Sequence, residues 1–151
     1  MFTSFELTQI NTKFWTVLGT VMKPHKSLSG SKVNWTNYNT KVKGMYFRLL
    51  AEKKSASVCF DFETKDEDIK ELQLAQFDEL KTMFRQTMPA EFKIKELVID
   101  KRVITRFETT LENCSLFNES TWPTMFAFYK SHLIAFDIFW SDFKDLFLEL
   151  K

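Results

Sequence analysis

Two carboxylates and one lysine alternate in the stretch DFETK, where Asp61, Glu63 and Lys65 stand two residues apart. On an extended strand, this spacing places all three side chains on one face. A pair of carboxylates can hold a divalent metal ion, and a lysine beside them can help to activate water for phosphodiester hydrolysis. Asp61, Glu63 and Lys65 are therefore the candidate catalytic set of this chain.

The acids of one strand alone rarely complete a metal site of this kind, so a further carboxylate is needed from the neighbouring strand. In an antiparallel hairpin, the end of the strand that contains Glu63 would lie beside residues 41–45, and none of these is acidic. Glu52 would lie at the far end of that hairpin, roughly 20 Å away at about 3.3 Å per residue. An acid two residues before a lysine occurs seven times in the chain, so the pattern has little specificity.

The same stretch can also be interpreted as the start of a helix. Thr64 and Glu67 match a capping box, in which each side chain bonds the backbone N–H of the other residue. The acidic residues 66–68 suit the positive end of a helix dipole. We favour this interpretation, which makes the chain non-catalytic.

No other residues suggest catalysis or a bound group. His25 and His132 have no Cys, His or acidic partner at the spacing of metal ligands. Cys59 and Cys114 form no Cys-x-x-Cys pair, which indicates free thiols in a reducing compartment. Three glycines in all leave no phosphate-binding loop. We therefore expect a cytoplasmic protein without a metal or a cofactor.

The first third of the chain has a different chemical character. From Leu7 to Ala51 there are seven Lys or Arg residues and no Asp or Glu. Within it, NWTNYNTKVKGMYFRL mixes aromatic rings with cations, which nucleic-acid-binding surfaces use for stacking and for phosphate contacts. The residues that would bind nucleic acid are Lys32, Trp35, Tyr38, Lys41, Lys43 and Arg48. The same residue types also suit a β-hairpin with a lysine-rich turn, and this structural interpretation is favoured.

Periodicity, capping residues and turn residues predict the order of the elements. A helix capped by Thr3 and Glu6 should end at Met22. It should be followed by a three-strand meander at 32–41, 45–52 and 56–63, a helix over 64–88, two strands at 92–99 and 103–111, and a long helix over 122–150. We predict one α+β domain over residues 1–151, with an antiparallel sheet of about five strands and helices mainly on one face. No run of eighteen apolar residues is present, so we expect no membrane span.

The predicted order of helix, meander, helix and strand is also the core order of the restriction-endonuclease-like nucleases. Their third strand carries a Glu-x-Lys motif, at the place where this chain has Glu63 and Lys65. A degenerate or noncanonical nuclease is therefore the enzyme alternative to a non-catalytic domain.

The last helix carries a wide aromatic stripe. The stripe contains Trp122, Phe126, Tyr129, Leu133, Phe136, Trp140, Phe143 and Phe147, and it is widened by Phe128, Ala135, Phe139 and Leu146. The sheet and the first helix would cover part of it, and we expect the partner in a homodimer to cover the rest.

Several stretches together resemble a family of bacterial domains of unknown function. They are FWTVLG with MKPH, then NWTNYNTKVKGMYFRL, LQLAQFDELK, and SLFNESTWPTMFAFY running into FDIFWSDFKDLF. The resemblance covers nearly the whole chain. Members of this family occur as small stand-alone proteins and as C-terminal domains behind nuclease-like domains. The resemblance implies an accessory role in nucleic-acid processing, and it transfers no catalytic residues.

The function expected from the sequence is a non-catalytic interaction module. A protein partner, including a second copy of the chain, is favoured over nucleic acid.

Overall fold

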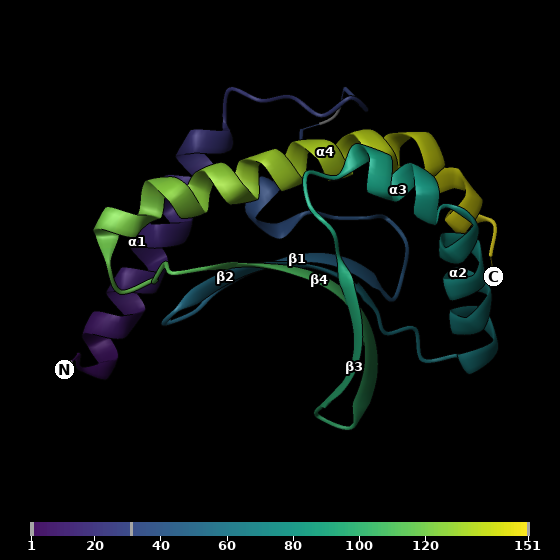
Figure 1. Ribbon diagram of the computed structural model, residues 1–151, viewed down its shortest axis with the longest axis horizontal. Helices are drawn as coiled ribbons and strands as arrows, with labels where there is room; N and C mark the ends of the chain where they lie inside the picture. The colour runs from purple at the N-terminus through teal and green to yellow at the C-terminus, as the bar shows by residue number, and fades with distance from the viewer. Residues whose placement is uncertain (1, 31, 151) are drawn as a thin grey trace.

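The computed structural model describes residues 2–30 and 32–150, which form a four-stranded antiparallel sheet with helices against one face (Figure 1). The α-helices are α1 (Ser4–Met22), α2 (Glu67–Glu79), α3 (Lys81–Thr87) and α4 (Trp122–Leu148). The strands are β1 (Met45–Ala51), β2 (Ser55–Phe62), β3 (Lys93–Ile99) and β4 (Arg102–Glu112). The strand order is β1-β2-β4-β3, so β2 and β4 are central. The predicted α+β class is confirmed.

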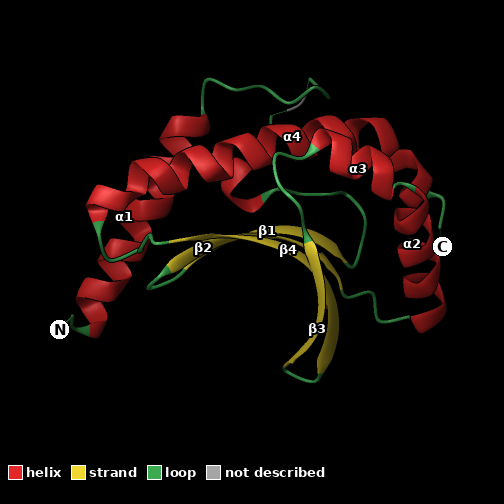
Figure 2. Ribbon diagram, viewed as in Figure 1, coloured by secondary structure: helices red, strands yellow, loops and turns green. Residues whose placement is uncertain are grey.

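The sheet is curved, and its two faces differ. The helices lie on the convex side, and in the described part of the chain no helix covers the concave side (Figure 2). Residues alternate along β2, so that Phe60 packs against Phe136 and Trp140 of α4, whereas Asp61 points to the concave face. β2 is therefore the strand that joins an aromatic layer to a charged one.

The prediction of about five strands is wrong, because residues 32–41 form no strand. Instead, a 3₁₀ turn (Trp35–Asn37) and a loop lie against α4. Trp35 donates to the carbonyl oxygen of His25 at 3.1 Å, and Tyr38 donates to a carboxylate oxygen of Asp137 at 2.6 Å. The two rings stand three residues apart, a spacing that a 3₁₀ turn places on one side and a strand places on opposite sides.

The predicted helix over 64–88 is two helices, and its predicted cap is wrong. Asp66 caps α2, since its Oδ1 accepts hydrogen bonds from the N–H groups of Asp68 and Ile69. Thr64 instead donates to Gln73 Oε1 at 2.6 Å. Asp is a better N-cap than Thr, and the helix therefore begins after Asp66 and not after Thr64. At the start of α1, the predicted capping box of Thr3 and Glu6 is confirmed.

The aromatic stripe of α4 is largely covered within one chain. Phe14 of α1 packs against Trp122, Phe126 and Tyr129, with ring centroids 4.9 to 6.1 Å apart. Further along α4, the 23–44 loop contributes Tyr38 and α3 contributes Phe84, which contact Phe136 and Phe139 respectively. A homodimer was expected because the stripe was judged too wide for one chain to cover, but side chains of the same chain cover most of it. The homodimer itself stays a prediction.

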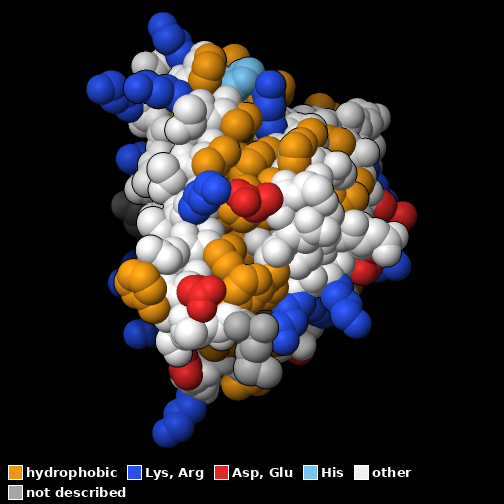
Figure 3. All heavy atoms as spheres, turned by 90° about the vertical axis from the view of Figure 1, so that its left-hand side faces the viewer, with side chains coloured by type: hydrophobic (Ala, Val, Ile, Leu, Met, Phe, Trp, Pro, Cys, Tyr) orange, Lys and Arg blue, Asp and Glu red, His pale blue; other side chains and the backbone are white. Residues whose placement is uncertain are grey.

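The face formed by α1 and the start of α4 mixes apolar and charged groups. Hydrophobic side chains gather in its middle, and the Lys and Arg side chains lie in several separate groups (Figure 3). On α1, Phe5 and Leu7 are exposed. Seen from this side, the Lys and Arg side chains do not form one continuous cationic patch.

The turn before β1 generates the first testable prediction. Gly44 has a φ of +84°, as its place in the turn required, and a Cβ there would lie 2.7 Å from the Cα of Thr64. Gly44→Ala should lower the free energy of unfolding by about 2 kcal/mol or more, because it adds a clash with backbone to a strained φ. Urea denaturation measures this.

Gly30→Ala is the matched control. Gly30 also has a positive φ of +77°, but a Cβ there would meet nothing within 4 Å. This variant should lose only the conformational cost of about 1 kcal/mol. Equal losses in the two variants would contradict the proposed clash at Thr64.

Candidate functional site

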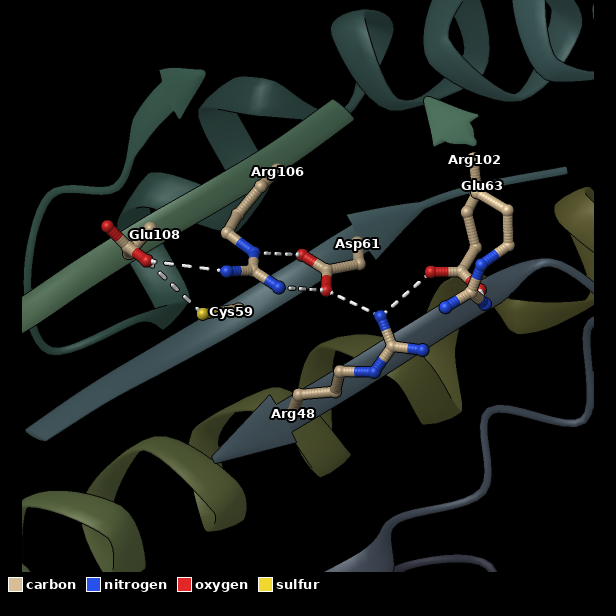
Figure 4. Close-up of polar contacts among 7 residues, drawn as sticks. All are labelled: Arg48, Cys59, Asp61, Glu63, Arg102, Arg106 and Glu108. Atoms are coloured by element: carbon tan, nitrogen blue, oxygen red, sulfur yellow. Dashed lines mark hydrogen bonds and ion pairs between the residues drawn. The ribbon is translucent and has the colours of Figure 1, made fainter. Parts of the chain in front are cut away.

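The concave face of the sheet carries a connected network of charged side chains, shown in Figure 4. Strand register places Asp61 of β2 directly opposite Arg106 of β4, and Cys59 opposite Glu108. Arg48 comes from β1, on the other side of β2. The network therefore ties three strands together on the face that no helix covers.

Asp61 is the centre of this network. Its carboxylate is fully buried, and it accepts two hydrogen bonds from Arg106, from Nε to Oδ1 at 2.7 Å and from Nη2 to Oδ2 at 2.8 Å. Arg48 Nη1 donates a third bond to Oδ2 at 2.7 Å. A carboxylate held by two guanidinium groups in this geometry satisfies the condition under which a buried charge is tolerated.

Glu63 extends the network toward the end of β2. It accepts from Arg48 Nη1 at 2.8 Å on one carboxylate oxygen and from Arg102 Nη1 at 2.8 Å on the other. Arg48 Nη1 thus lies between Asp61 and Glu63 and bonds both. This is the place that a metal ion shared by the two carboxylates would take.

Two members of the network, Arg106 and Cys59, are chemically unreactive. Hydrogen bonding to Asp61 raises the pKa of Arg106, so that the guanidinium stays charged. Burial raises the pKa of the Cys59 thiol well above its usual range, and the thiol contacts Glu108 Oε2 at 3.5 Å. A thiol that stays protonated is a poor nucleophile. Cys59 is therefore a structural residue.

The candidate catalytic residues are only partly brought together. Asp61 and Glu63 share one face, as their spacing predicted, but their oxygens are occupied by arginine side chains. Lys65 is exposed beyond the end of β2 and is not in the network. Among residues 2–30 and 32–150, no three His, Cys, Asp or Glu side chains gather as a metal site requires.

The candidate nucleic-acid-binding residues are also divided by the structure. Trp35 and Tyr38 are 6% and 9% exposed, so their rings are not available to stack on bases. Arg48 is engaged with the two carboxylates, and Lys32 lies exposed in the 23–44 loop. Lys41 and Lys43 are exposed near the start of β1, close to Lys65.

Arg102, Arg106 and Glu108 were missed in the analysis of the sequence. For Arg106 and Glu108 a signal was present, because they stand two residues apart on the strand predicted over 103–111 and therefore share one face. Arg102 lay in the predicted turn before that strand. Their partners were not visible, since the pairing of β2 with β4 joins segments that a helical pair separates in the sequence.

These features describe an α+β domain with a helix-covered curved sheet and an arginine–carboxylate network on its concave face. The family model of a domain of unknown function, DUF4268, matches residues 10–144, so the chain belongs to that family. Comparison with curated proteins and with solved structures found no match. None of the helices in the described part of the chain is both long and apolar enough to cross a bilayer.

The network generates a stability prediction. Asp61→Asn should lower the free energy of unfolding by about 3 kcal/mol, because it leaves the buried guanidinium of Arg106 without its countercharge. Denaturant unfolding followed by circular dichroism measures the loss.

Glu108→Gln is the control on the same face. Its carboxylate lies 3.9 Å from Arg106 and 3.0 Å from Lys95, and the Lys95 side chain is 51% exposed. This variant should cost less than about 1 kcal/mol. If Asp61→Asn cost no more than Glu108→Gln, the central role of Asp61 would be refuted.

Proposed function

We propose that this domain is a non-catalytic interaction module that binds an extended segment of a partner protein along strand β3. The observation that carries the non-catalytic part is the position of Arg48 Nη1, 2.7 Å from Asp61 and 2.8 Å from Glu63. A cation fixed there supports a structural role for the two carboxylates, because they already have the partner that a metal would otherwise supply.

Strand β3 is an edge of the sheet, with one side paired to β4. The β3–β4 turn has two residues, Asp100 and Lys101, both with positive φ, as a type I′ hairpin requires. The residues flanking such a turn bond to each other, and bonded pairs then alternate along the ladder. The N–H and C=O groups of Ile94, Glu96 and Val98 therefore point away from β4 and can pair with an added strand.

The side chains of these residues share the convex side of the sheet. Ile94 is 63% exposed and Val98 is 67% exposed. Val103 of β4 pairs with Val98 and is 52% exposed. An edge with unpaired backbone beside exposed aliphatic side chains is the arrangement that peptides use when they extend a sheet.

The charge of the edge selects the occupant. An antiparallel strand centred on Glu96 would place apolar residues opposite Ile94 and Val98 and a basic residue opposite Glu96. A second copy paired in this register would place Glu96 against Glu96, and like charges directly opposite are destabilising. A partner segment with a central lysine or arginine between apolar residues fits the edge better than a second copy.

The test uses two designed peptides, one with valine, lysine and valine opposite these three positions and one with valine, glutamate and valine. The wild-type domain should bind the lysine peptide about fivefold more tightly, because the cross-strand charges attract. Glu96→Lys should reverse this preference. Fluorescence anisotropy of labelled peptides measures both affinities.

Val98→Asp should abolish binding of the lysine peptide, and Leu72→Asp is its control. Leu72 is 51% exposed on α2, so the change there adds the same charge outside β3. Self-association by sedimentation that is lost in Val98→Asp would identify a second copy as the occupant. Equal affinity for both peptides, unchanged by Glu96→Lys, would contradict the proposal.

A nucleic-acid accessory role is the second candidate function. Lys41, Lys43 and Lys65 are exposed near one another, and in the described residues no acid pairs with them. The family resemblance also favours this role, because members of the family are expected behind nuclease-like domains. Cations of this kind bind phosphates without reading sequence.

In this role, labelled single- and double-stranded oligonucleotides should bind with a strong salt dependence. The double variant Lys41→Ala and Lys43→Ala should lower the salt slope by roughly two, because two phosphate contacts are lost. Lys53→Ala with Lys54→Ala, at the opposite end of β1, is the control. No binding at about 50 mM salt with tens of micromolar protein would remove this candidate.

The same oligonucleotides, incubated with Mg²⁺ or Mn²⁺, test the degenerate nuclease. That alternative requires cleavage which is lost in Glu63→Gln while the fold is retained. The proposed interaction module should leave the oligonucleotides intact.

A further inference from the structure

A cavity of about 630 Å³ lies where β1 begins and β2 ends, and it is independent of the β3 edge. α2 and the end of α4 close its sides. Its apolar wall consists of Val42, Ile69, Phe147, Leu148 and Leu150. A volume of this size, lined mostly by apolar side chains with a few polar groups, is typical of small-molecule sites.

The charged residues that line the cavity are mainly cations. Lys41, Lys43, Lys65 and Arg102 are positive. The two acids of the lining are already engaged: Glu63 accepts from Arg48 and Arg102, and Asp66 accepts from two N–H groups of α2. Among the described residues, none of the three lysines forms an ion pair in this lining. The lining of the cavity therefore has more positive than negative side chains, and within the part of the chain that the structure describes its three lysines are left without an ion pair.

The backbone of Lys41 adds a separate argument. Its φ is 67°, a conformation that glycine or asparagine adopts at lower cost. The N–H of Lys41 donates to Asn39 Oδ1 at 2.8 Å, so the loop holds this strained conformation. A cationic side chain is thus presented to the cavity from a position where a side chain is unfavourable for folding.

We propose that this cavity binds an amphipathic anion, with a phosphate or carboxylate head group held by Lys41, Lys43 and Lys65 and an apolar body against Leu148 and Ile69. Lysine ammonium groups bind such head groups through charge-assisted hydrogen bonds. The apolar body would be removed from water by the wall of the cavity. A nucleotide and a fatty acid both have this chemistry.

The experiment uses 8-anilinonaphthalene-1-sulfonate, a fluorescent aromatic anion, as the probe on the full chain. Lys41→Gly should weaken probe binding about tenfold, the equivalent of one charged hydrogen bond. The same variant should raise the temperature of unfolding, because glycine relieves the positive φ. Loss of binding in a more stable protein separates a ligand role from a structural one.

Lys101→Gly is the matched control. Lys101 has the same φ of 67° but lies in the β3–β4 turn, outside the cavity lining. It should gain stability and bind the probe as the wild type does. Leu148→Trp, which fills the cavity from a partly exposed position, should abolish probe binding and leave the affinity for the β3 peptides unchanged.

Competition identifies the source of the head group. Displacement of the probe by decanoate supports a fatty-acid-like ligand, and displacement by adenosine monophosphate supports a nucleotide-like one. Probe binding that is unchanged in both Lys41→Gly and Leu148→Trp would overturn the proposal. Inorganic phosphate that displaces the probe as well as the two organic anions do would overturn its amphipathic character.

Discussion

The structure depends on a buried carboxylate on a sheet face that no helix within residues 2–30 and 32–150 covers. Asp61 is fully buried, and its burial comes from the arginine side chains that bind it. Removing a carboxylate from water is costly unless its partners replace the lost hydrogen bonds with good geometry. Arg48 and Arg106 can do so only if β1 and β4 both flank β2 in the observed register. The ion network thus favours one strand order over the alternatives, whatever its net contribution to stability.

The other face of β2 imposes a complementary constraint. Phe60 contacts rings from β1, α2, α3 and α4, so one aromatic cluster joins β1 and β2 to three helices. A strand with aromatic residues on one face and charged residues on the other cannot slip by one residue without exchanging the two layers. The aromatic layer on one face of β2 uses several of the 17 Phe residues of the chain.

Local signals in the sequence predicted local structure well. The alternation of β2, the hairpin at Asp100 and Lys101 and the cap at Thr3 all depend on residues close in the chain, and all are found. The prediction of a strand at 32–41 was wrong because aromatic and β-branched residues suit both a strand and a loop packed on a helix. The loop conformation of this segment is held by hydrogen bonds that join Tyr38 to Asp137 and Thr40 to Trp140, about 100 residues away in the sequence.

The candidate site shows the same limit. The spacing of Asp61 and Glu63 correctly placed them on one face, but their chemistry depends on Arg102 and Arg106 from β4. Sequence spacing gives the face of a side chain, whereas its ionic partners follow from strand order. The positive charge of the acid-free first third of the chain is only partly neutralised by folding, because Arg48 is paired with carboxylates while, among the described residues, Lys41 and Lys43 are not.

The helices do not cover the full length of the strands. α4 and α3 bury the middle of β2 and β4, and the β3–β4 hairpin continues past them (Figure 1). Val98 and Val103 are left exposed there, and so is Ile94 further along β3. At the start of β1, the ends of α2 and α4 meet the sheet without filling the space between them, and the cavity results. Both candidate binding surfaces therefore arise where the helical layer ends. The cavity shares Glu63 and Arg102 with the ion network, whereas Ile94, Glu96 and Val98 of the β3 edge take no part in it.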